Sequence, residues 1–161
     1  MLHYGADDAC VYSPMLRVQF FYGLPRAGRF PGGKVHMKTT FLLVIAGGLG
    51  AVSRHTISSW IHGQTGGGFP WGTMIVNVMG CLLFGLLWTL AEDRFLIPRT
   101  ASFIILTGFV GSFTTFSTMT FETLNLIKTS QWLTALVYLG TGQTLGILAA
   151  LAGIGMAKTI S

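Results

Sequence analysis

Four long apolar stretches constrain this chain more than any other feature of its sequence. They run over residues 41–61, 71–91, 101–127 and 132–157. Each is long enough for a helix that crosses a bilayer, which needs about 20 apolar residues. Only 9% of the 161 residues are charged, against roughly 25% in an average soluble protein. We therefore predict an all-α membrane protein with four transmembrane helices in the lipid bilayer.

The residues at the ends of these stretches support the same prediction. Pro70 and Pro98 stand where the second and third helices should begin, a position that suits proline. Tryptophans favour the boundary between lipid and water, and all four lie near predicted helix ends: Trp60, Trp71, Trp88 and Trp132.

Residues 1–36 differ in composition from the rest of the chain. They hold three of the five prolines and mixed charge, without an apolar run of membrane-spanning length. We expect Met37 to be the natural first residue and 1–36 to be an upstream extension; the alternative is a genuine disordered arm. Residues 37–161 then form the membrane domain.

The distribution of basic residues leaves the orientation of the chain undecided. The positive-inside rule counts lysine and arginine near helix ends. From residue 37 on, one side of the predicted bundle would carry Lys38, Arg94, Arg99 and Lys158, and the other Arg54 and Lys128. A bias this weak permits insertion in both orientations. Our hypothesis is that two copies pair antiparallel as a homodimer, each supplying half of a pore.

Several function classes are excluded by the same composition. The net charge of +5 is not gathered into a basic patch with interleaved aromatics, so no nucleic-acid partner is expected. Cys10 and Cys81 form no CxxC pair, and the four histidines are scattered without helical ligand spacing. No base, nucleophile pair or cofactor loop suggests an enzyme.

The third apolar stretch carries the densest group of polar residues. Residues 108–118 contain two glycines, five hydroxyl side chains and three phenylalanines at membrane depth. Non-helical backbone is tolerated there only inside protein or along a water-filled path. Gly108 and Gly111, with the β-branched Thr114 and Thr115, weaken the helix. We predict a break in mid-membrane that exposes carbonyl groups to cations and N–H groups to anions.

Three other residues could carry a function, and two of them permit a second interpretation. Asn77 is an amide inside the second stretch, where it either bonds a neighbouring helix or faces a polar pore. Phe116 offers a positive ring edge that can line an anion path. Glu122 is the only acidic residue within the last three stretches, and it is either interfacial or functional.

The fourth stretch is open to two interpretations, whereas the small residues indicate helix packing. Thr141 and Thr144 share one helix face and form either a polar track or bonds to their own backbone. Small residues spaced by four, such as Gly47 with Ala51 and Gly142 with Gly146, predict close helix packing.

Three segments in order carry a resemblance to a known family. They are Gly47 to Arg54, Gly72 to Gly80, and the long Thr107 to Thr118, followed by Glu122. From about Met37 to its end, the chain resembles the small bacterial CrcB/Fluc fluoride channels. Residues 1–36 match nothing in that family.

The resemblance implies a dual-topology antiparallel dimer in the bacterial inner membrane, with two pores that let cytoplasmic fluoride leave passively. A sodium ion would sit at the dimer centre, held by the backbone carbonyls of Gly111 and Thr114. Arg54 would lie in the vestibule. The residues expected to line the pore are Asn77, Thr115, Phe116, Ser117, Thr118, Met119, Tyr138 and Thr144.

Two departures from the family pattern stand out. Its second ring position falls on Met119, which has no ring edge but is polarizable. A serine of the fourth helix falls on Gly142. Two alternative functions remain: a small four-helix multidrug transporter, which would need a carboxylate deep in the first helix, and a non-transporting membrane accessory subunit.

Overall fold

The computed structural model describes residues 37–66 and 68–160, and these fold into four helical spans apolar and long enough to cross a membrane. The prediction of an all-helical membrane protein is confirmed at this level. The predicted extension, 1–36, lies outside the described residues. The elements are α2 (Met37–Thr65), α3 (Trp71–Glu92), α4 (Arg99–Phe103), the π-helical segment η2 (Ile104–Val110), α5 (Gly111–Phe113), α6 (Phe116–Lys128) and α7 (Trp132–Thr159).

The predicted boundaries agree closely with these elements. α3 begins at Trp71 directly after Pro70, and α4 begins directly after Pro98, so both prolines are N-caps. α2 is longer at both ends than the predicted 41–61. Polar residues at the ends of α2 continue the helix because its backbone hydrogen bonds do not depend on side-chain hydropathy.

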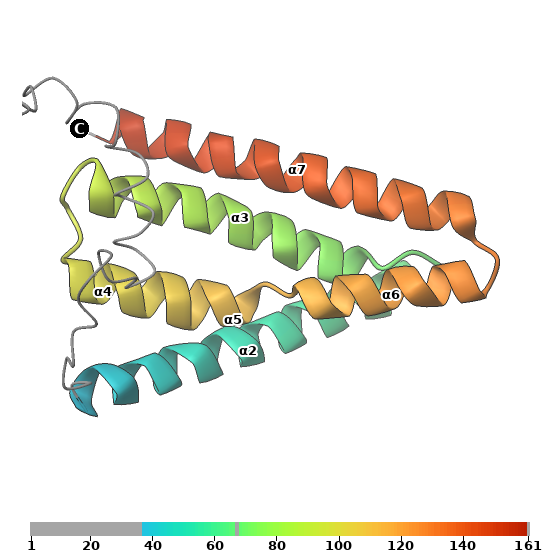
Figure 1. Cartoon of the computed structure of the whole chain (residues 1–161), viewed down its shortest axis with the longest axis horizontal. Helices are drawn as coiled ribbons and strands as arrows, with labels where there is room; N and C mark the ends of the chain where they lie inside the picture. The colour runs from blue at the N-terminus through green and yellow to red at the C-terminus, as the bar shows by residue number, and fades with distance from the viewer. Residues whose placement is uncertain (1–36, 67, 161) are drawn as a thin grey trace, which may run out of the picture. The chain divides into compact units, whose positions relative to one another are not determined.

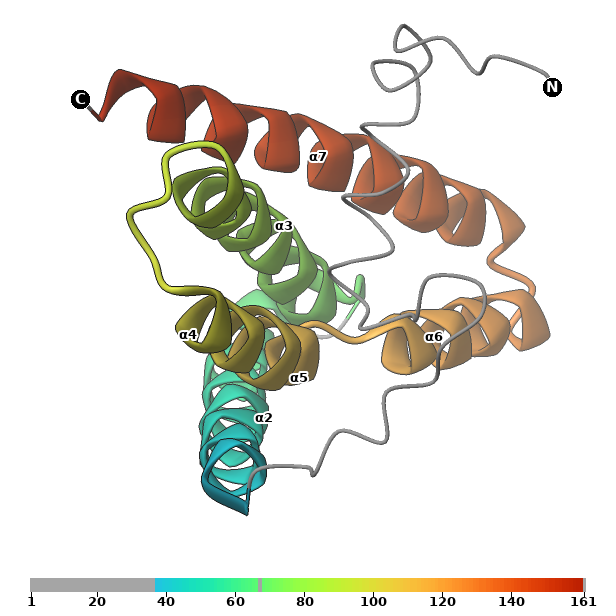
Figure 2. The same cartoon turned by 60° about the vertical axis from the view of Figure 1, so that its left-hand side comes forward.

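The spans run alternately up and down (Figure 1). The first residues of α2, the α3–α4 connection and the end of α7 lie at one end of the bundle. There the Arg94 guanidinium donates a hydrogen bond to the carbonyl of Lys158. α3 packs mainly along α7, whereas α2 packs against η2 and α5, an arrangement visible in Figure 2. α2 and α3 also contact each other directly.

Close approach of the spans depends on glycine, as predicted for the small residues. A Cβ added at Gly50 would overlap the Phe109 carbonyl of η2, and one at Gly85 would overlap the Ala150 carbonyl of α7. Gly47 meets the Ser112 hydroxyl, with 3.3 Å between an added Cβ and Oγ. These contacts place α2 against the third span and α3 against α7.

The outer surfaces of α2 and α7 are strongly apolar. In the most apolar 18-residue stretch of α2 only 6% of the residues are buried, whereas 33% are buried in the corresponding stretch of α3. Exposed side chains on these two helices include Phe41, Val44, Leu133, Leu136 and Leu151. Large apolar side chains facing outward suit lipid, which solvates them as well as a protein core does.

Candidate functional site

The third span breaks at Thr114 and Thr115. α5 ends at Phe113 and α6 begins at Phe116; between them the backbone is extended, with φ −82° and ψ 157° at Thr114 and φ −148° and ψ 111° at Thr115. The predicted break is therefore present, but it lies at the two threonines rather than at the glycines. Gly108 is π-helical and packs against α2, where an added Cβ would come within 2.9 Å of the Ala46 Cβ.

Asn77 of α3 holds the broken backbone in place. Its Oδ1 accepts from the Thr115 N–H at 2.7 Å, and its Nδ2 donates to the Thr115 carbonyl at 3.1 Å. A backbone N–H or carbonyl group without a hydrogen-bond partner costs several kcal/mol at membrane depth. The side-chain amide supplies both partners. The structure therefore shows the interhelical bond, and a place for Asn77 in a polar pore stays a prediction.

At the break, two backbone N–H groups bond to side chains instead of to the carbonyl groups that they would meet in a helix. In an unbroken helix the Gly111 carbonyl would accept from the Thr115 N–H, which is instead bound to Asn77. The Thr114 carbonyl would accept from the Thr118 N–H, which is bound to the Thr115 hydroxyl at 3.2 Å. Gly111 is exposed and Thr114 half-buried. These are the two carbonyls expected to bind a cation.

The first turn of α6 gathers the hydroxyl groups of the site. Thr115 is its N-cap, and the Thr115 hydroxyl donates to the Thr118 Oγ1 at 2.9 Å. The Thr115 Oγ1 also lies 3.4 Å from the Ser117 Oγ. Ser117 and Thr118 are both exposed. Together with the positive end of the helix dipole, these groups favour an anion near the break.

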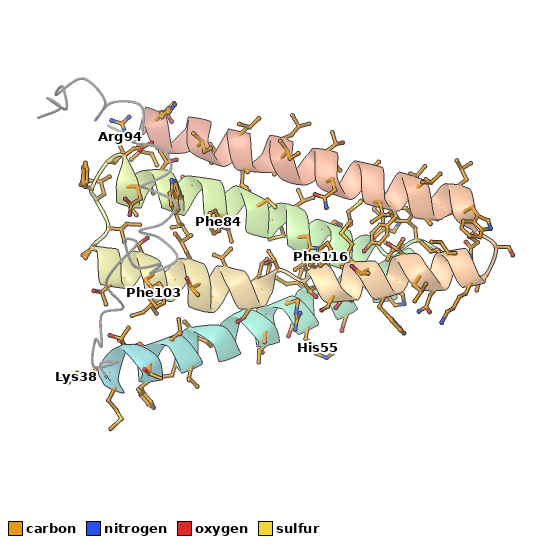
Figure 3. All side chains as sticks on the ribbon, viewed as in Figure 1. Lys38, His55, Phe84, Arg94, Phe103 and Phe116 are labelled. Carbon is orange, nitrogen blue, oxygen red and sulfur yellow. The ribbon has the colours of Figure 1, made fainter. Side chains whose placement is uncertain are left out.

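One cavity of about 430 Å³ lies along α3, the break and α7. Phe84 on α3 and Phe116 at the beginning of α6 both line it and are labelled in Figure 3. Phe116 is 76% exposed. The predicted residues on its wall are Asn77, Gly111, Thr114, Thr115, Phe116 and Met119.

A second cavity of about 210 Å³ lies between α2, α3 and the break. We call it the vestibule; its lining residues are Arg54, His55, Ser58, Ser59, Thr73, Thr115 and Thr118. Arg54 lines this cavity, and its role at the entrance of a pore stays a prediction. Thr115 lines both cavities, so the extended turn at the break forms part of the wall of each.

Met119 is buried, unlike Phe116. It is 5% exposed and packs with Met74 and Tyr138. Its sulfur lies 3.9 Å from the Asn77 Nδ2 as a weak hydrogen-bond acceptor. A Cβ added at Gly142 would lie 2.6 Å from the Met119 Cε. The two departures from the family pattern are therefore neighbours, and the methionine methyl occupies the space that glycine leaves.

Glu122 links three spans because its carboxylate accepts hydrogen bonds from hydroxyl groups on two other spans. Its Oε1 accepts from the Thr73 hydroxyl at 2.8 Å, and its Oε2 accepts from the Tyr138 hydroxyl at 2.6 Å. Thr73 is 4% exposed and Tyr138 is fully buried. These bonds fix the position of the carboxylate, and whether Glu122 is interfacial or functional is left open. The sequence argument missed Thr73. Glu122, the single acid of the last three predicted stretches, could have indicated that a partner hydroxyl lies nearby.

The remaining predicted positions lie on α7. Tyr138 reaches Glu122 rather than either of the two cavities, and Thr144 is exposed and lines neither of them. Thr141 donates to the Val137 carbonyl at 2.6 Å, which is the backbone-bonded alternative. A role for Thr144 in a pore stays a prediction.

Comparison with known proteins identifies the family. The family model described as CrcB-like protein, Camphor Resistance (CrcB), matches residues 41–154, which include both cavities. The chain belongs to the CrcB family. The match covers all four spans, and the CrcB region begins beyond residues 1–36.

Individual CrcB relatives agree with the family model. Over 118 residues the chain is 42% identical to a protein of Nitrosococcus oceani named fluoride-specific ion channel FluC, covering 73% of this chain and 94% of that protein. A protein of the same name from Nitratidesulfovibrio vulgaris (strain Miyazaki F) is 41% identical over 124 residues, 77% of this chain and all of the relative. One from Acidobacterium capsulatum is 39% identical over 118 residues.

Proposed function

We propose that this protein is a fluoride-selective channel that lets fluoride leave the cytoplasm passively and so lowers its toxicity. The relatives are named as fluoride-specific channels. The observation that carries the proposal is the break at Thr115, held by Asn77, with a cavity on either side of it. It offers hydrogen-bond donors to an anion in the middle of the span.

Fluoride is small and strongly hydrated, so a pore must replace its water shell with many donors. Arg54 and Thr118 provide donors in the vestibule, and Asn77 provides them beyond the break. One Asn77 N–H faces only the Met119 sulfur, a weak acceptor that fluoride can replace. Phe116 adds a ring edge. Successive moderate sites allow an ion to leave as well as enter.

The assembly we propose is an antiparallel homodimer in the bacterial inner membrane. The weak charge bias permits both orientations, and the larger cavity lies on the side of the chain where Phe116 is exposed. A second copy there would complete each pore. The relatives come from bacteria, where a protein with four spans of this kind belongs in the inner membrane.

A sodium ion at the dimer centre is part of this proposal. Unwound carbonyl groups within a membrane are suited to sodium, and Gly111 and Thr114 carry the two carbonyls whose helical donors are diverted. The residues present therefore fit the ion. Bound there, sodium would offset the negative ends of the carbonyl dipoles from both copies.

The test is ion flux through the purified full-length protein in liposomes loaded with potassium fluoride. Valinomycin carries potassium, and a fluoride electrode follows release. We expect fast release of fluoride with negligible release of chloride from matched vesicles. No fluoride release from protein inserted in both orientations would refute the channel and favour the accessory subunit. A drug transporter is disfavoured because α2 carries no Asp or Glu.

A further inference from the structure

His55 is a titratable residue that the pore described above does not use. It lies next to Arg54 on α2, is exposed, and lines the vestibule. Figure 3 shows it on the part of α2 that passes the beginning of α6. Arg54 is half-buried in the same wall. Two nitrogen-bearing side chains thus share one small cavity with access to the break.

The other walls of the vestibule contribute hydroxyl groups. Thr73 comes from α3, and Thr115 and Thr118 come from the break and α6. No acidic side chain lines this cavity in the described part of the chain. An acid bonded to the lining is Glu122, whose carboxylate accepts a hydrogen bond from the Thr73 hydroxyl. On α2 itself the next titratable group is His62, about two turns further on.

When it is protonated, an imidazole beside a guanidinium adds a second positive charge to an anion site. Imidazole gains its proton between about pH 5 and pH 8. An anion in the cavity stabilises the charged form of the imidazole by electrostatic attraction. Proton and anion therefore favour each other's binding by the same factor. A cavity with one sign of charge and low-dielectric walls also raises the local concentration of counter-ions.

We propose that His55 is a second, proton-dependent anion-attracting group of the vestibule, which takes small inorganic anions. Protonation of His55 raises the occupancy of the vestibule and the rate of entry into the pore. Neutral His55 leaves Arg54 as the charged group that attracts the anion. This inference rests on the proposed channel function and adds a residue that sets its pH dependence.

The experiment measures fluoride release from liposomes containing the full-length protein, at equal internal and external pH, from about pH 8 to about pH 5.5. Release from protein-free liposomes corrects for leakage of HF. At fluoride concentrations below saturation we expect release by the unaltered protein to rise about two- to tenfold as the pH falls. His55→Gln should stay at the high-pH rate throughout, and His55→Lys should stay at the low-pH rate.

The matched control is His62→Gln, which changes an exposed histidine on the same helix that does not line the vestibule. It should keep the unaltered pH profile. High concentrations of an impermeant salt should flatten the profile of the unaltered protein, because screening weakens attraction between exposed charges. A purely structural role of His55 would not respond to salt in this way.

Two outcomes separate this inference from the channel proposal. Flux that rises equally in the unaltered protein and in His55→Gln, or flux that is flat with pH in both, would overturn the role of His55 and leave the channel intact. Absence of fluoride flux at every pH would overturn the channel itself. A failure of His55→Gln to fold is distinguished by His55→Lys, which retains a charge in the same place.

Discussion

Asn77 shows how one side chain can stabilise a broken helix in a membrane. Its amide hydrogen-bonds both backbone groups of Thr115, and Thr115 is only 7% exposed. A buried N–H left without a partner costs about 1–3 kcal/mol. The same amide that holds the break also lines the larger cavity.

We expect Asn77→Ala to lower both thermal stability and fluoride flux. The Thr115 N–H and carbonyl lose their partners, and the cavity loses an amide donor. Flux should fall about tenfold or more, as for a barrier raised by about 1.4 kcal/mol. Electrode-detected release from liposomes measures it. Asn125→Ala, an exposed amide of α6, should change neither quantity; flux near normal in Asn77→Ala would reduce Asn77 to a packing residue.

Met119 and Gly142 are in contact, and both stand where the resemblance to the family leads us to expect another residue. The Met119 methyl lies where a side chain at position 142 would begin. Residues in direct contact show interaction free energies of about 0.5–3 kcal/mol. A phenylalanine at 119 and a serine at 142 are therefore not independent substitutions.

We expect Gly142→Ser and Met119→Phe to give non-additive effects. Gly142→Ser alone should displace the Met119 methyl, disturb its contact with Asn77 and reduce flux several-fold, about 0.5–1 kcal/mol. The double variant should differ from the sum of the two single variants in thermal stability and in flux. Gly140→Ser is the control, because an added Cβ there meets nothing within 4 Å. Strict additivity would show that the two sites do not interact.

Among the helices, the third span is the one whose form is least regular. It begins as an α-helix, passes through the π-helical η2 and breaks before α6. π-Helical turns occur often at functional sites. Here η2 lies against α2, where Gly50 permits contact with the Phe109 carbonyl. The packing of α2 against η2 thus positions the residues that lead into the break.

We expect Gly50→Ala to destabilise the protein and Gly48→Ala to be tolerated. The new Cβ at 50 would overlap backbone that cannot rotate away, and overpacking costs about 1–3 kcal/mol. At 48 an added Cβ meets nothing within 4 Å, and alanine in a helix gains about 0.5–1 kcal/mol over glycine. Thermal denaturation in detergent compares the two. Equal melting temperatures would contradict the proposed contact.

At the scale of the whole bundle, the described residues present much apolar surface and basic side chains at both ends. Many of its exposed apolar side chains lie on α2 and α7, and others lie on α6 and on the α3–α4 connection, while basic side chains occur at both ends. Lys38, Arg94 and Lys158 belong to one end and Lys128 to the other. The antiparallel dimer that we propose depends on insertion of the chain in both orientations.

We expect a protease-sensitive tag at the C-terminus to be cleaved from outside in roughly half of the molecules. Thr40→Arg adds a charge to the more basic end, so it should bias insertion to one orientation and lower flux. Gln64→Arg adds a charge at the opposite end of α2 and should bias insertion the other way. Co-expression of the two variants should restore flux. A tag that is wholly protected or wholly cleaved in the unaltered protein would contradict dual topology.

The sequence alone was enough to predict the four spans, their order and the approximate position of the break. Length and hydropathy are local properties, and Pro70 and Pro98 mark helix starts by removing a backbone donor. The same local signals placed Asn77, Thr115 and Phe116 at membrane depth. Those features needed no knowledge of which span lies beside which.

Only the tertiary structure decided which polar groups are paired. Asn77 meets Thr115 from another span, Glu122 meets Thr73 and Tyr138, and the break falls at the threonines because Asn77 supplies partners there. The contact of Met119 with Gly142 was equally absent from the pattern. Such contacts join residues far apart in the chain, and they leave no periodic trace because their geometry is set by how helices pack in three dimensions.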